Sequence, residues 1–209
     1  LEFVRKHGRT VGFTDVISAP CSALLEVSTA EADRARPLIE GLLAEALASG
    51  LVADARIATS RAQQQSLWQL RELMSEVQKH EGGSIKHDVS LPLARVPEFL
   101  ERASKIVEEV CPGARPVPFG HLGDGNVHYN VSQPVDMDRG AYLALWGEMS
   151  DAIHQLVAEM GGSISAEHGI GRMKRDDLRR FKDPVALDLM RAIKAAFDPN
   201  GILNPGKVL

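Results

Sequence analysis

The sequence predicts an α+β fold in which helices pack on one side of an antiparallel sheet. Strand-like and helix-like segments alternate along the 209 residues. The strand-like segments are short and half polar, whereas a parallel sheet covered on both faces needs continuous apolar runs. The sequence also lacks the glycine-rich motifs of Rossmann and P-loop nucleotide sites. Together these observations favour split βαβ units of the ferredoxin-like type.

Two strands and two helices are expected in the first 80 residues. Residues 22–28 are apolar and strand-like, and residues 52–59 also look like a strand. Residues 31–49 carry apolar residues at helical spacing, and Gly50 is the expected stop. Residues 61–79 form the second expected helix, whose apolar stripe comprises Leu67, Leu70, Leu73, Met74 and Val77.

A strand over residues 84–91 follows the glycine pair that ends the second helix. Its side chains alternate between two faces. The apolar face carries Ile85, Val89 and Leu91, and the polar face carries Lys86, Asp88 and Ser90. Pro92 then precedes a helix over about 94–110. Residues 116–132 are expected to form a strand, an irregular turn and a second strand.

The rest of the chain is mostly helical in its pattern. Residues 138–160 and 184–197 are expected helices, and residues 163–167 are short and strand-like. Residues 172–182 interleave basic residues with two aspartates, which indicates a solvated helix face or a local anion contact. The final "FDPNGILNPGKVL" contains two prolines and two glycines, so it is ordered only if it packs on something.

The composition is ordinary for a soluble globular protein, with 44% apolar and 25% charged residues. The net charge of −4 excludes the basic footprint of a nucleic-acid-binding domain. No apolar run reaches the ~18–20 residues of a membrane span, and no signal peptide is present. We therefore expect a cytoplasmic protein without a transmembrane segment, or one attached peripherally to the inner membrane.

Two further features concern the cysteines and the start of the chain. Cys21 and Cys111 are expected to be buried thiols in a reducing compartment, with a disulfide between them as the alternative. The first residue is Leu1 rather than Met, and the opening "LEFVRKHGRTVGF" reads like the middle of a polypeptide. The chain is therefore expected to be part of something longer.

Residues 120–130, "GHLGDGNVHYN", concentrate side chains that could bind a ligand. His121 and His128 are seven residues apart, so an uninterrupted strand would place them on opposite faces. They converge only if the Gly-Asp-Gly between them makes a bulge or a turn. Neutral imidazoles are common metal ligands, but two histidines lack a third ligand. A hairpin with two polar histidines is the alternative interpretation.

The third candidate ligand lies in "SISAEHGIG". Glu167 and His168 are adjacent, and Gly169 and Gly171 could bend the backbone so that both side chains address one cavity. Two histidines and one carboxylate would match Zn²⁺, Mn²⁺ or Fe²⁺ with open coordination positions. The alternative is an exposed loop with a solvated glutamate.

Two cationic side chains, Arg71 and Lys86, could bind a substrate carboxylate. Arg71 and Ser75 are one turn apart on the second helix and share a face. The guanidinium of Arg71 suits a carboxylate, although a pair with a surface acid is the simpler interpretation. Lys86 lies on the polar face of its strand, where a solvated lysine is the simpler interpretation.

Three segments, "GHLGDGNVHYN", "SISAEHGIGRMK" and "DPNGILNPGKVL", occur in an order that resembles the C-terminal half of FAD-linked 2-hydroxyacid dehydrogenases. These flavoproteins of the vanillyl-alcohol oxidase fold include D-lactate dehydrogenases, the glycolate oxidase flavin subunit and D-2-hydroxyglutarate dehydrogenases. The segment "RELMSEVQKHEGGSIKHDVSLP" fits the same half. The resemblance spans essentially the whole chain and implies the ferredoxin-like cap domain of these oxidases.

The resemblance also implies roles for individual residues. It assigns three metal ligands, His121, His128 and Glu167, and it assigns His168 as the base beside the substrate. It implies that four residues hold the substrate carboxylate and neighbouring oxygens: Arg71, Ser75, Lys86 and Asn130. Ser75 stands where some relatives carry Thr, which keeps the hydroxyl. The tail around Asn204–Lys207 would pack towards the flavin domain, which brings Asn204 and Lys207 to the cofactor.

A function follows from these roles. The complete enzyme would oxidise a small D-2-hydroxy acid to the 2-oxo acid by hydride transfer to FAD. Residues 1–209 would be its substrate or cap region, and the N-terminal FAD-binding domain is absent from this chain. The implied partners are the 2-hydroxy acid and the FAD-binding domain or subunit, with homo-oligomerisation left open. The alternatives are a catalytically silent domain that binds a metal or a partner, and a metal-dependent hydrolase.

Overall fold

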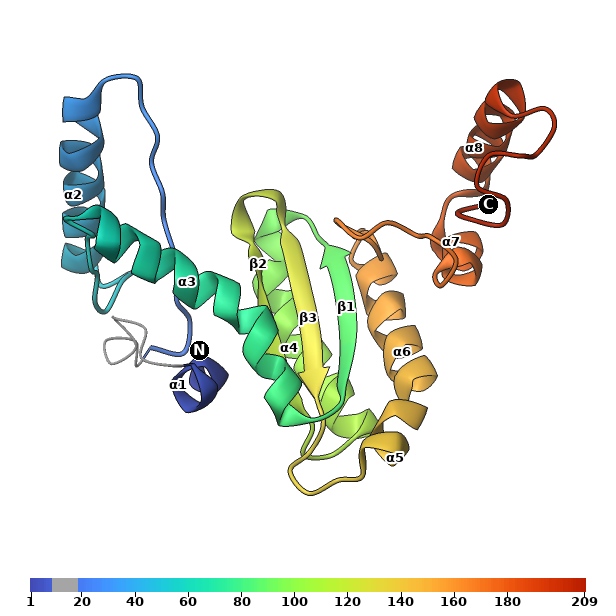
Figure 1. Cartoon of the computed structure of the whole chain (residues 1–209), viewed down its shortest axis with the longest axis horizontal. Coiled ribbons are helices and arrows are strands. Elements are labelled where there is room, and N and C mark those ends of the chain that lie inside the picture. The colour runs from blue at the N-terminus through green and yellow to red at the C-terminus, as the bar shows by residue number, and fades with distance from the viewer. Residues whose placement is uncertain (9–18) are drawn as a thin grey trace. The chain divides into compact units, whose positions relative to one another are not determined.

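The computed structural model describes residues 1–8 and 19–209, which form two compact units (Figure 1). The first unit is Leu1–His80 and the second is Glu81–Leu209. Within the described part of the chain, none of the helices is long and apolar enough to cross a membrane.

The first unit contains three α-helices. They are α1 at Glu2–His7, α2 at Ala32–Ala48 and α3 at Arg61–Val77, followed by a short 3-10 helix, η2, at Gln78–Glu81. The side chain of Ser60 accepts a hydrogen bond from the Gln63 N–H and caps α3. The small core of this unit joins α1 to α3 through Val4, Leu70 and Val77. Both predicted helices of this region are confirmed.

The two strands predicted in the first unit are wrong. Residues 22–28 and 52–59 adopt no strand, and neither pairs with another segment in the described residues. A strand needs a neighbour for its backbone N–H and C=O groups, and an apolar run alone does not supply one. Cys21 lies in the loop that leads into the first of these segments, so it is an exposed thiol rather than the buried one predicted. Cys111 is buried and free, as predicted.

The second unit is built on a three-stranded antiparallel sheet. Its strands are β1 at Ser84–Ser90, β2 at Arg115–His121 and β3 at Asn126–Ser132, in the order β1-β3-β2. Because β3 runs antiparallel to both neighbours, β1 and β2 are parallel and are separated by the central strand. The connection between them contains α4 at Val96–Val110, preceded by η3 at Leu93–Arg95. This is a split βαβ unit, and the predicted α+β fold with an antiparallel sheet is confirmed.

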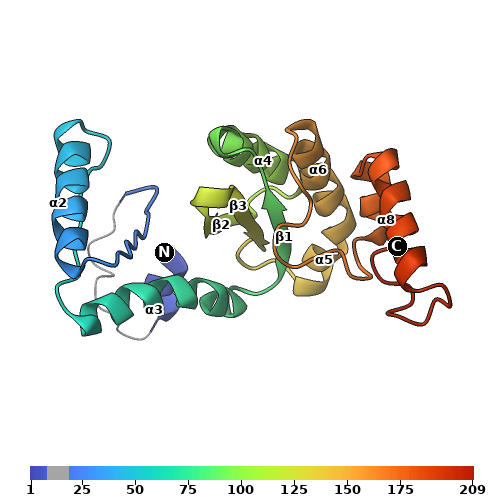
Figure 2. The same ribbon diagram turned by 90° about the horizontal axis from the view of Figure 1, so that it is seen from above.

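Two helices, α4 and α6, lie side by side on one face of the sheet (Figure 2). Phe99, Ala103 and Val107 recur every fourth residue of α4 and are fully buried. They meet apolar side chains of the sheet, Ile85, Val89, Val127, Tyr129 and Val131. The helices are therefore on one side, as predicted, and the other face of the sheet carries the polar residues of β1 and β3.

The predicted helix over residues 138–160 is two helices. They are α5 at Arg139–Ala144 and α6 at Trp146–Glu159, and the backbone leaves the helical region at Leu145, where ψ is 0°. The separate α5 places the hydroxyl of Tyr142 against the carbonyl of Val131, to which it donates a hydrogen bond of 2.6 Å. Tertiary contact thus decides where this long apolar pattern breaks.

The predicted strand at residues 163–167 is only a single bridge between Ser90 and Ser163. Beyond it the N–H groups of residues 166–168 donate to the side chain of Asp88, and of these the Ala166 N–H also reaches the backbone carbonyl of Asp88 at 3.3 Å. A side chain that accepts three consecutive backbone donors replaces the ladder. This segment is therefore a loop.

The C-terminal region forms two helices and an ordered tail. They are α7 at Arg175–Phe181 and α8 at Pro184–Phe197. In α7, Arg179 pairs with Asp176 on the surface, as expected for a solvated helix face. Asp198 accepts hydrogen bonds from the N–H groups of Ile202 and Leu203 and orders the tail after α8.

We predict that Gly125→Ala lowers the free energy of unfolding by on the order of 2–4 kcal/mol. Gly125 has φ +67°, and a Cβ there would lie 2.0 Å from the Leu91 carbonyl oxygen. Gly123→Ala is the matched control in the same hairpin, because a Cβ at Gly123 meets nothing within 4 Å. Urea unfolding of the two variants measures the difference. Equal losses in both would contradict this account of the turn.

We also predict that His87 makes the unit less stable in acid. Burial lowers the pKa of His87 to about 4, against the opposing effect of the hydrogen bond between Nδ1 and the Tyr129 carbonyl. Between pH 6.5 and 4 the unfolded chain binds a proton that the folded chain does not, so stability falls as the pH falls. The loss reaches roughly 3 kcal/mol.

The measurement is urea unfolding as a function of pH. His87→Asn should flatten the dependence between pH 6.5 and 4, whereas His80→Asn, at an exposed position, should leave it unchanged. An unaltered slope in His87→Asn would refute the role of this histidine.

Candidate functional site

The two motif histidines lie on the same face of the sheet. β2 ends at His121, the 3-10 helix η4 occupies Leu122–Asp124, and Gly125 adopts the left-handed conformation before β3 begins. The chain therefore reverses between the histidines, and His128 pairs with Phe119 while His121 pairs with Asn126. Paired residues of antiparallel strands point to the same side. The predicted turn and the convergence of the histidines are confirmed.

Glu167 lies between the two histidines. Its Oε1 is 2.8 Å from Nδ1 of His121, and its Oε2 is 3.6 Å from Nε2 of His128. The amide of Asn126 also donates a hydrogen bond to Oε1. His128 is nearly buried, whereas the side chains of His121 and Glu167 are half exposed. One carboxylate thus approaches both imidazoles at the open end of the hairpin.

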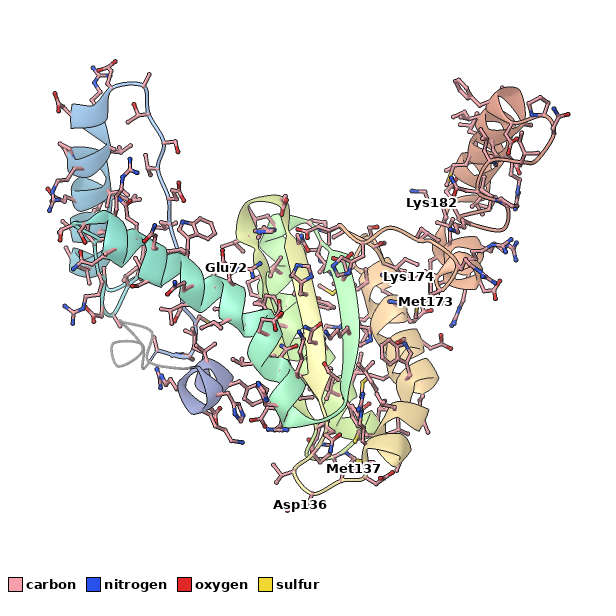
Figure 3. All side chains as sticks on the ribbon, in the orientation of Figure 1. Glu72, Asp136, Met137, Met173, Lys174 and Lys182 are labelled. Carbon is pink, nitrogen blue, oxygen red and sulfur yellow. The ribbon has the colours of Figure 1, made fainter. Side chains whose placement is uncertain are left out.

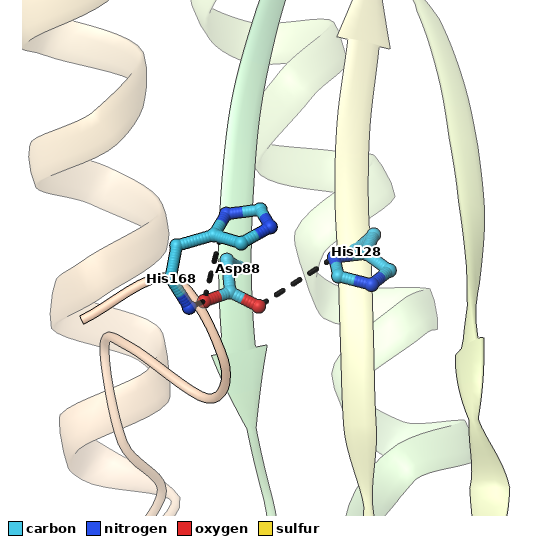
Figure 4. A group of neighbouring side chains, drawn as sticks. All are labelled: Asp88, His128 and His168. Atoms are coloured by element: carbon cyan, nitrogen blue, oxygen red, sulfur yellow. Dashed lines mark hydrogen bonds and ion pairs between the residues drawn. The ribbon is translucent and has the colours of Figure 1, made fainter. Parts of the chain in front are cut away.

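Asp88 on β1 holds the loop that supplies Glu167. Its Oδ2 accepts hydrogen bonds from the N–H groups of Ala166, Glu167 and His168 at 3.1, 2.9 and 2.8 Å. Its Oδ1 faces Nδ1 of His128 at 3.5 Å (Figure 4). Burial raises the pKa of the Asp88 carboxyl, but the hydrogen bonds from His168 and Glu167 outweigh it, and the net pKa is lowered. Asp88 therefore stays charged although its side chain is 3% exposed.

His168 stands at the exposed edge of this cluster. Its ring stacks on that of His128, with centroids 5.4 Å apart and an interplanar angle of 20°. Nδ1 of His168 is 3.7 Å from Oδ2 of Asp88, and its side chain is 66% exposed. Ligand atoms of Asp88, His128 and His168 all lie within 4.8 Å of one another.

Lys86 and Asn130 lie beside the cluster on the same face. They pair directly across β1 and β3, two residues along from the Asp88–His128 pair. That spacing corresponds to about 7 Å along a strand. Asn130 is buried and Lys86 is exposed. Both therefore lie on the same face of the sheet as His128, one pair further along β1 and β3.

Lys174 ties the start of the loop to the rest of the unit. It lies in the segment between α6 and α7, where it is labelled in Figure 3. Its Nζ donates to the carbonyl of Ile164 at 2.7 Å. Burial lowers the pKa of Lys174, and the carboxylates of Asp88 and Asp177 oppose that effect. The loop is thus anchored through both its N–H groups and a carbonyl.

The other four predicted residues lie on α3 and in the C-terminal tail. Arg71 and Ser75 lie one turn apart on α3, which belongs to the unit Leu1–His80. Asn204 and Lys207 lie in the exposed C-terminal tail, where the N–H of Lys207 donates to the carbonyl of Asn204. The next residue, Val208, donates its N–H to the carbonyl of Gly171. The tail is thereby attached to the loop that carries Glu167 and His168.

Asp88 and Asn126 were not among the predicted site residues. A signal existed for Asp88, because the alternation of β1 places it on the same polar face as Lys86. Asn126 occurs within the glycine-rich motif but reads there as a turn residue. Their contacts with the Glu167 loop span 41 to 80 residues of sequence, and no local pattern encodes contacts at that distance.

Comparison with known proteins finds a matching family and several relatives. A family model described as "FAD linked oxidases, C-terminal domain" matches residues 7–208. A D-2-hydroxyglutarate dehydrogenase of Stutzerimonas stutzeri is 39% identical over 90% of this chain and 40% of its own length. The mitochondrial D-2-hydroxyglutarate dehydrogenase of Rattus norvegicus is 37% identical over 93% of this chain and 35% of its own length. One from Xanthomonas citri pv. viticola is 34% identical over the whole chain and 43% of its own length. The chain thus spans less than half the length of these relatives.

Proposed function

We propose, on the premise that the chain belongs to the family of FAD linked oxidase C-terminal domains, that it is the substrate-binding part of a flavin-dependent dehydrogenase. The reaction would oxidise a small D-2-hydroxy acid to the 2-oxo acid, in keeping with the names of the relatives. The observation that carries the proposal is the position of Glu167 between His121 and His128 on the open face of the sheet.

The flavin part would lie in the portion of the protein that this chain does not span. The relatives are more than twice as long as the segment they share with this chain. We infer that residues 1–209 form the cap and C-terminal region, and that Asn204 and Lys207 in the tail face the flavin. Attachment of the tail to Gly171 supports this inference, because it joins the tail to the loop of the candidate base.

The residues present fit a divalent metal ion. Two imidazoles and a carboxylate are a donor set suited to Zn²⁺, Mn²⁺ or Fe²⁺. Ligand atoms that share one zinc ion at about 2.0–2.2 Å lie roughly 3.3 Å apart in a tetrahedron. The 3.6 Å between Nε2 of His128 and Oε2 of Glu167 is close to that separation. A bound cation would polarise a substrate hydroxyl and lower its pKa.

Two ligand sets compete for such an ion, and we favour His121, His128 and Glu167. The alternative, Asp88 with His128 and His168, has ligand atoms within 4.8 Å. However, Oδ2 of Asp88 already accepts three backbone N–H groups. Giving that oxygen to a metal would leave these donors unpaired, which is costly for groups that are partly buried. Among the described residues Oδ1 of Asp88 has no hydrogen-bond donor, but it is inaccessible to solvent. Glu167 has no comparable commitment to the backbone.

The chain's own residues would bind the acid and move one proton. His168 is exposed beside the cluster, and Nδ1 faces Asp88, so Nε2 is the atom placed to accept the proton of the hydroxyl. The carboxylate of Asp88 would stabilise the imidazolium that results. Lys86 and Asn130 would orient the acid, and Arg71 and Ser75 would hold its carboxylate. FAD, when bound, supplies the hydride acceptor.

A second candidate function is a domain that binds a metal or a partner without turnover by itself. The observation in its favour is that all the clustered residues lie in Glu81–Leu209, so an ion could bind without any flavin. Activity of the full-length protein towards a 2-hydroxy acid separates the two functions.

We predict that Zn²⁺ raises the thermal stability of this chain and that Glu167→Gln removes most of the effect. Binding to the folded state alone stabilises by about 2.7 kcal/mol at one hundred times Kd. Loss of the carboxylate should weaken affinity at least ~10-fold. Differential scanning fluorimetry over a zinc titration measures both.

Glu159→Gln is the matched control for this titration. Glu159 has a similarly exposed side chain but pairs with Arg102 on the surface. An absence of any zinc effect in the unsubstituted chain, or an equal effect in Glu167→Gln, would count against the metal site.

We predict that His168→Ala and Arg71→Ala separate chemistry from binding in the full-length enzyme. His168→Ala should lower kcat by about 10²–10⁴-fold, because it removes the group that accepts the proton. Arg71→Ala should chiefly raise KM, because a carboxylate is charged in both the ground and the transition state. Lys86→Ala should resemble Arg71→Ala.

The measurement is steady-state kinetics on a panel of D-2-hydroxy acids with an artificial electron acceptor. His80→Ala and Lys79→Ala, both at exposed positions, serve as controls. Unchanged turnover in His168→Ala, with kcat abolished in Arg71→Ala at saturating acid, would reverse the assigned roles.

A further inference from the structure

A single buried carboxylate, that of Asp88, contacts His128, His168 and the backbone of the loop that bears Glu167. The side chain of Asp88 is 3% exposed, and such a charge is expensive to bury unless hydrogen bonds satisfy it. Oδ2 receives three consecutive N–H groups, all from the loop that bears Glu167 and His168. This oxygen therefore fixes the backbone from which both side chains project.

The other oxygen of Asp88 is turned towards His128. Within residues 1–8 and 19–209, no donor is in hydrogen-bonding geometry with Oδ1, and it faces Nδ1 of His128 at 3.5 Å. An ionised carboxylate has lone pairs and no proton to donate. The contact is attractive only when Nδ1 of the imidazole carries a proton.

A proton on Nδ1 determines what the opposite side of the ring can do. In a neutral imidazole with Nδ1–H, Nε2 carries the lone pair. Nε2 of His128 points at Oε2 of Glu167, 3.6 Å away. Glu167 would equally attract a proton on Nε2, but its side chain is 42% exposed and water can solvate it, whereas Oδ1 of Asp88 is buried and has no hydrogen-bond donor in the described part of the chain. Nδ1 is therefore the nitrogen that takes the proton, and the lone pair of Nε2 is left for a cation shared with Glu167. A metal-binding histidine is commonly oriented by an acceptor on its other nitrogen.

We propose that Asp88 is a positioning residue, in which one oxygen holds the 166–168 backbone and the other selects the Nδ1–H tautomer of His128. The consequence for metal binding rests on the proposed function. The tautomer of His128 and the anchoring of the loop do not, because both are properties of the chain without any ion.

The substitution Asp88→Asn separates the two effects. The amide oxygen can still accept the N–H groups of residues 166–168, so the loop should remain anchored. The amide nitrogen would then face His128, and it can only donate. His128 should therefore change to the Nε2–H tautomer, which removes the lone pair directed at Glu167. Asp88→Ala should lose both effects.

Asp198→Asn provides a matched control. Asp198 is also a buried aspartate that accepts two backbone N–H groups, those of Ile202 and Leu203. Neither of these hydrogen bonds involves the His128 cluster. A general cost of removing a charge from a buried aspartate would appear in both variants, whereas a change of the His128 tautomer should appear only in Asp88→Asn.

The test combines three measurements on this chain. Long-range ¹H–¹⁵N NMR identifies the tautomer of His128, hydrogen exchange reports the protection of the 166–168 amides, and calorimetry measures the affinity for zinc alone. We expect Nδ1–H in the unsubstituted chain and Nε2–H in Asp88→Asn, with amide protection largely kept. Zinc affinity should fall about 10–100-fold in Asp88→Asn.

The outcomes distinguish this inference from the proposed function. An Nε2–H tautomer in the unsubstituted chain would overturn the inference, and this measurement does not depend on whether any variant folds. An unchanged tautomer in a folded Asp88→Asn would also overturn it. If the tautomer switches as expected but the unsubstituted chain binds no zinc, Asp88 keeps its positioning role and the metal site fails.

Discussion

The hydrogen bonds from three consecutive N–H groups to the Asp88 carboxylate are the interaction on which the cluster depends. They join β1 to a loop about eighty residues later in the chain. Removing this acceptor would leave the N–H groups of Glu167 and His168 without the partner that holds them to β1. Glu167 and His168 project from the backbone that the carboxylate holds, so their side chains meet the hairpin histidines only because that backbone is fixed.

Buried polar side chains on the central strand β3 make this arrangement less stable than an apolar strand would. Every residue of β3 is buried, and four of the seven are polar: Asn126, His128, Asn130 and Ser132. Apolar residues at these positions would be the cheaper choice for a buried strand, because polar groups lose water on burial. Among the described residues, the side-chain oxygens of Asn126 and Ser132 lack a hydrogen-bond partner. Buried polar groups that are only partly satisfied are typical of a site under selection for function rather than stability.

Apolar packing on the opposite face of the sheet stabilises this unit. There the residues of β1 and β3 meet α4 and α6 in a continuous core whose members are almost completely buried. The same alternation that directs His128 and Asn130 to the polar face directs Tyr129 and Val131 into this core. A slip of one residue in the β1–β3 register would exchange the two faces. The core therefore also fixes which polar side chains stand beside Asp88.

Several elements could be predicted from local pattern. The helices α2, α3, α4 and α8 follow apolar spacing, and β1 follows strict alternation. The hairpin was predictable because the glycines of "GHLGDGNVHYN" permit a reversal that brings the histidines to one face. Residues 22–28 and 52–59 have a similar apolar pattern but form no strand, since pairing depends on a neighbour that the segment itself does not specify.

By itself, the sequence determined the α+β class, the two faces of β1 and the residue types of the candidate site, because these depend on side-chain periodicity and on motifs within a few residues. The tertiary structure decided that 163–167 is a loop, that the helix over 138–160 breaks at Leu145, and that Asp88 and Asn126 join the cluster. Each of these outcomes is accompanied by a hydrogen bond between different elements of the fold, over separations of 11 to 80 residues. Such a bond forms only after the sheet and its helices have brought the two partners together, so local sequence carries no record of it.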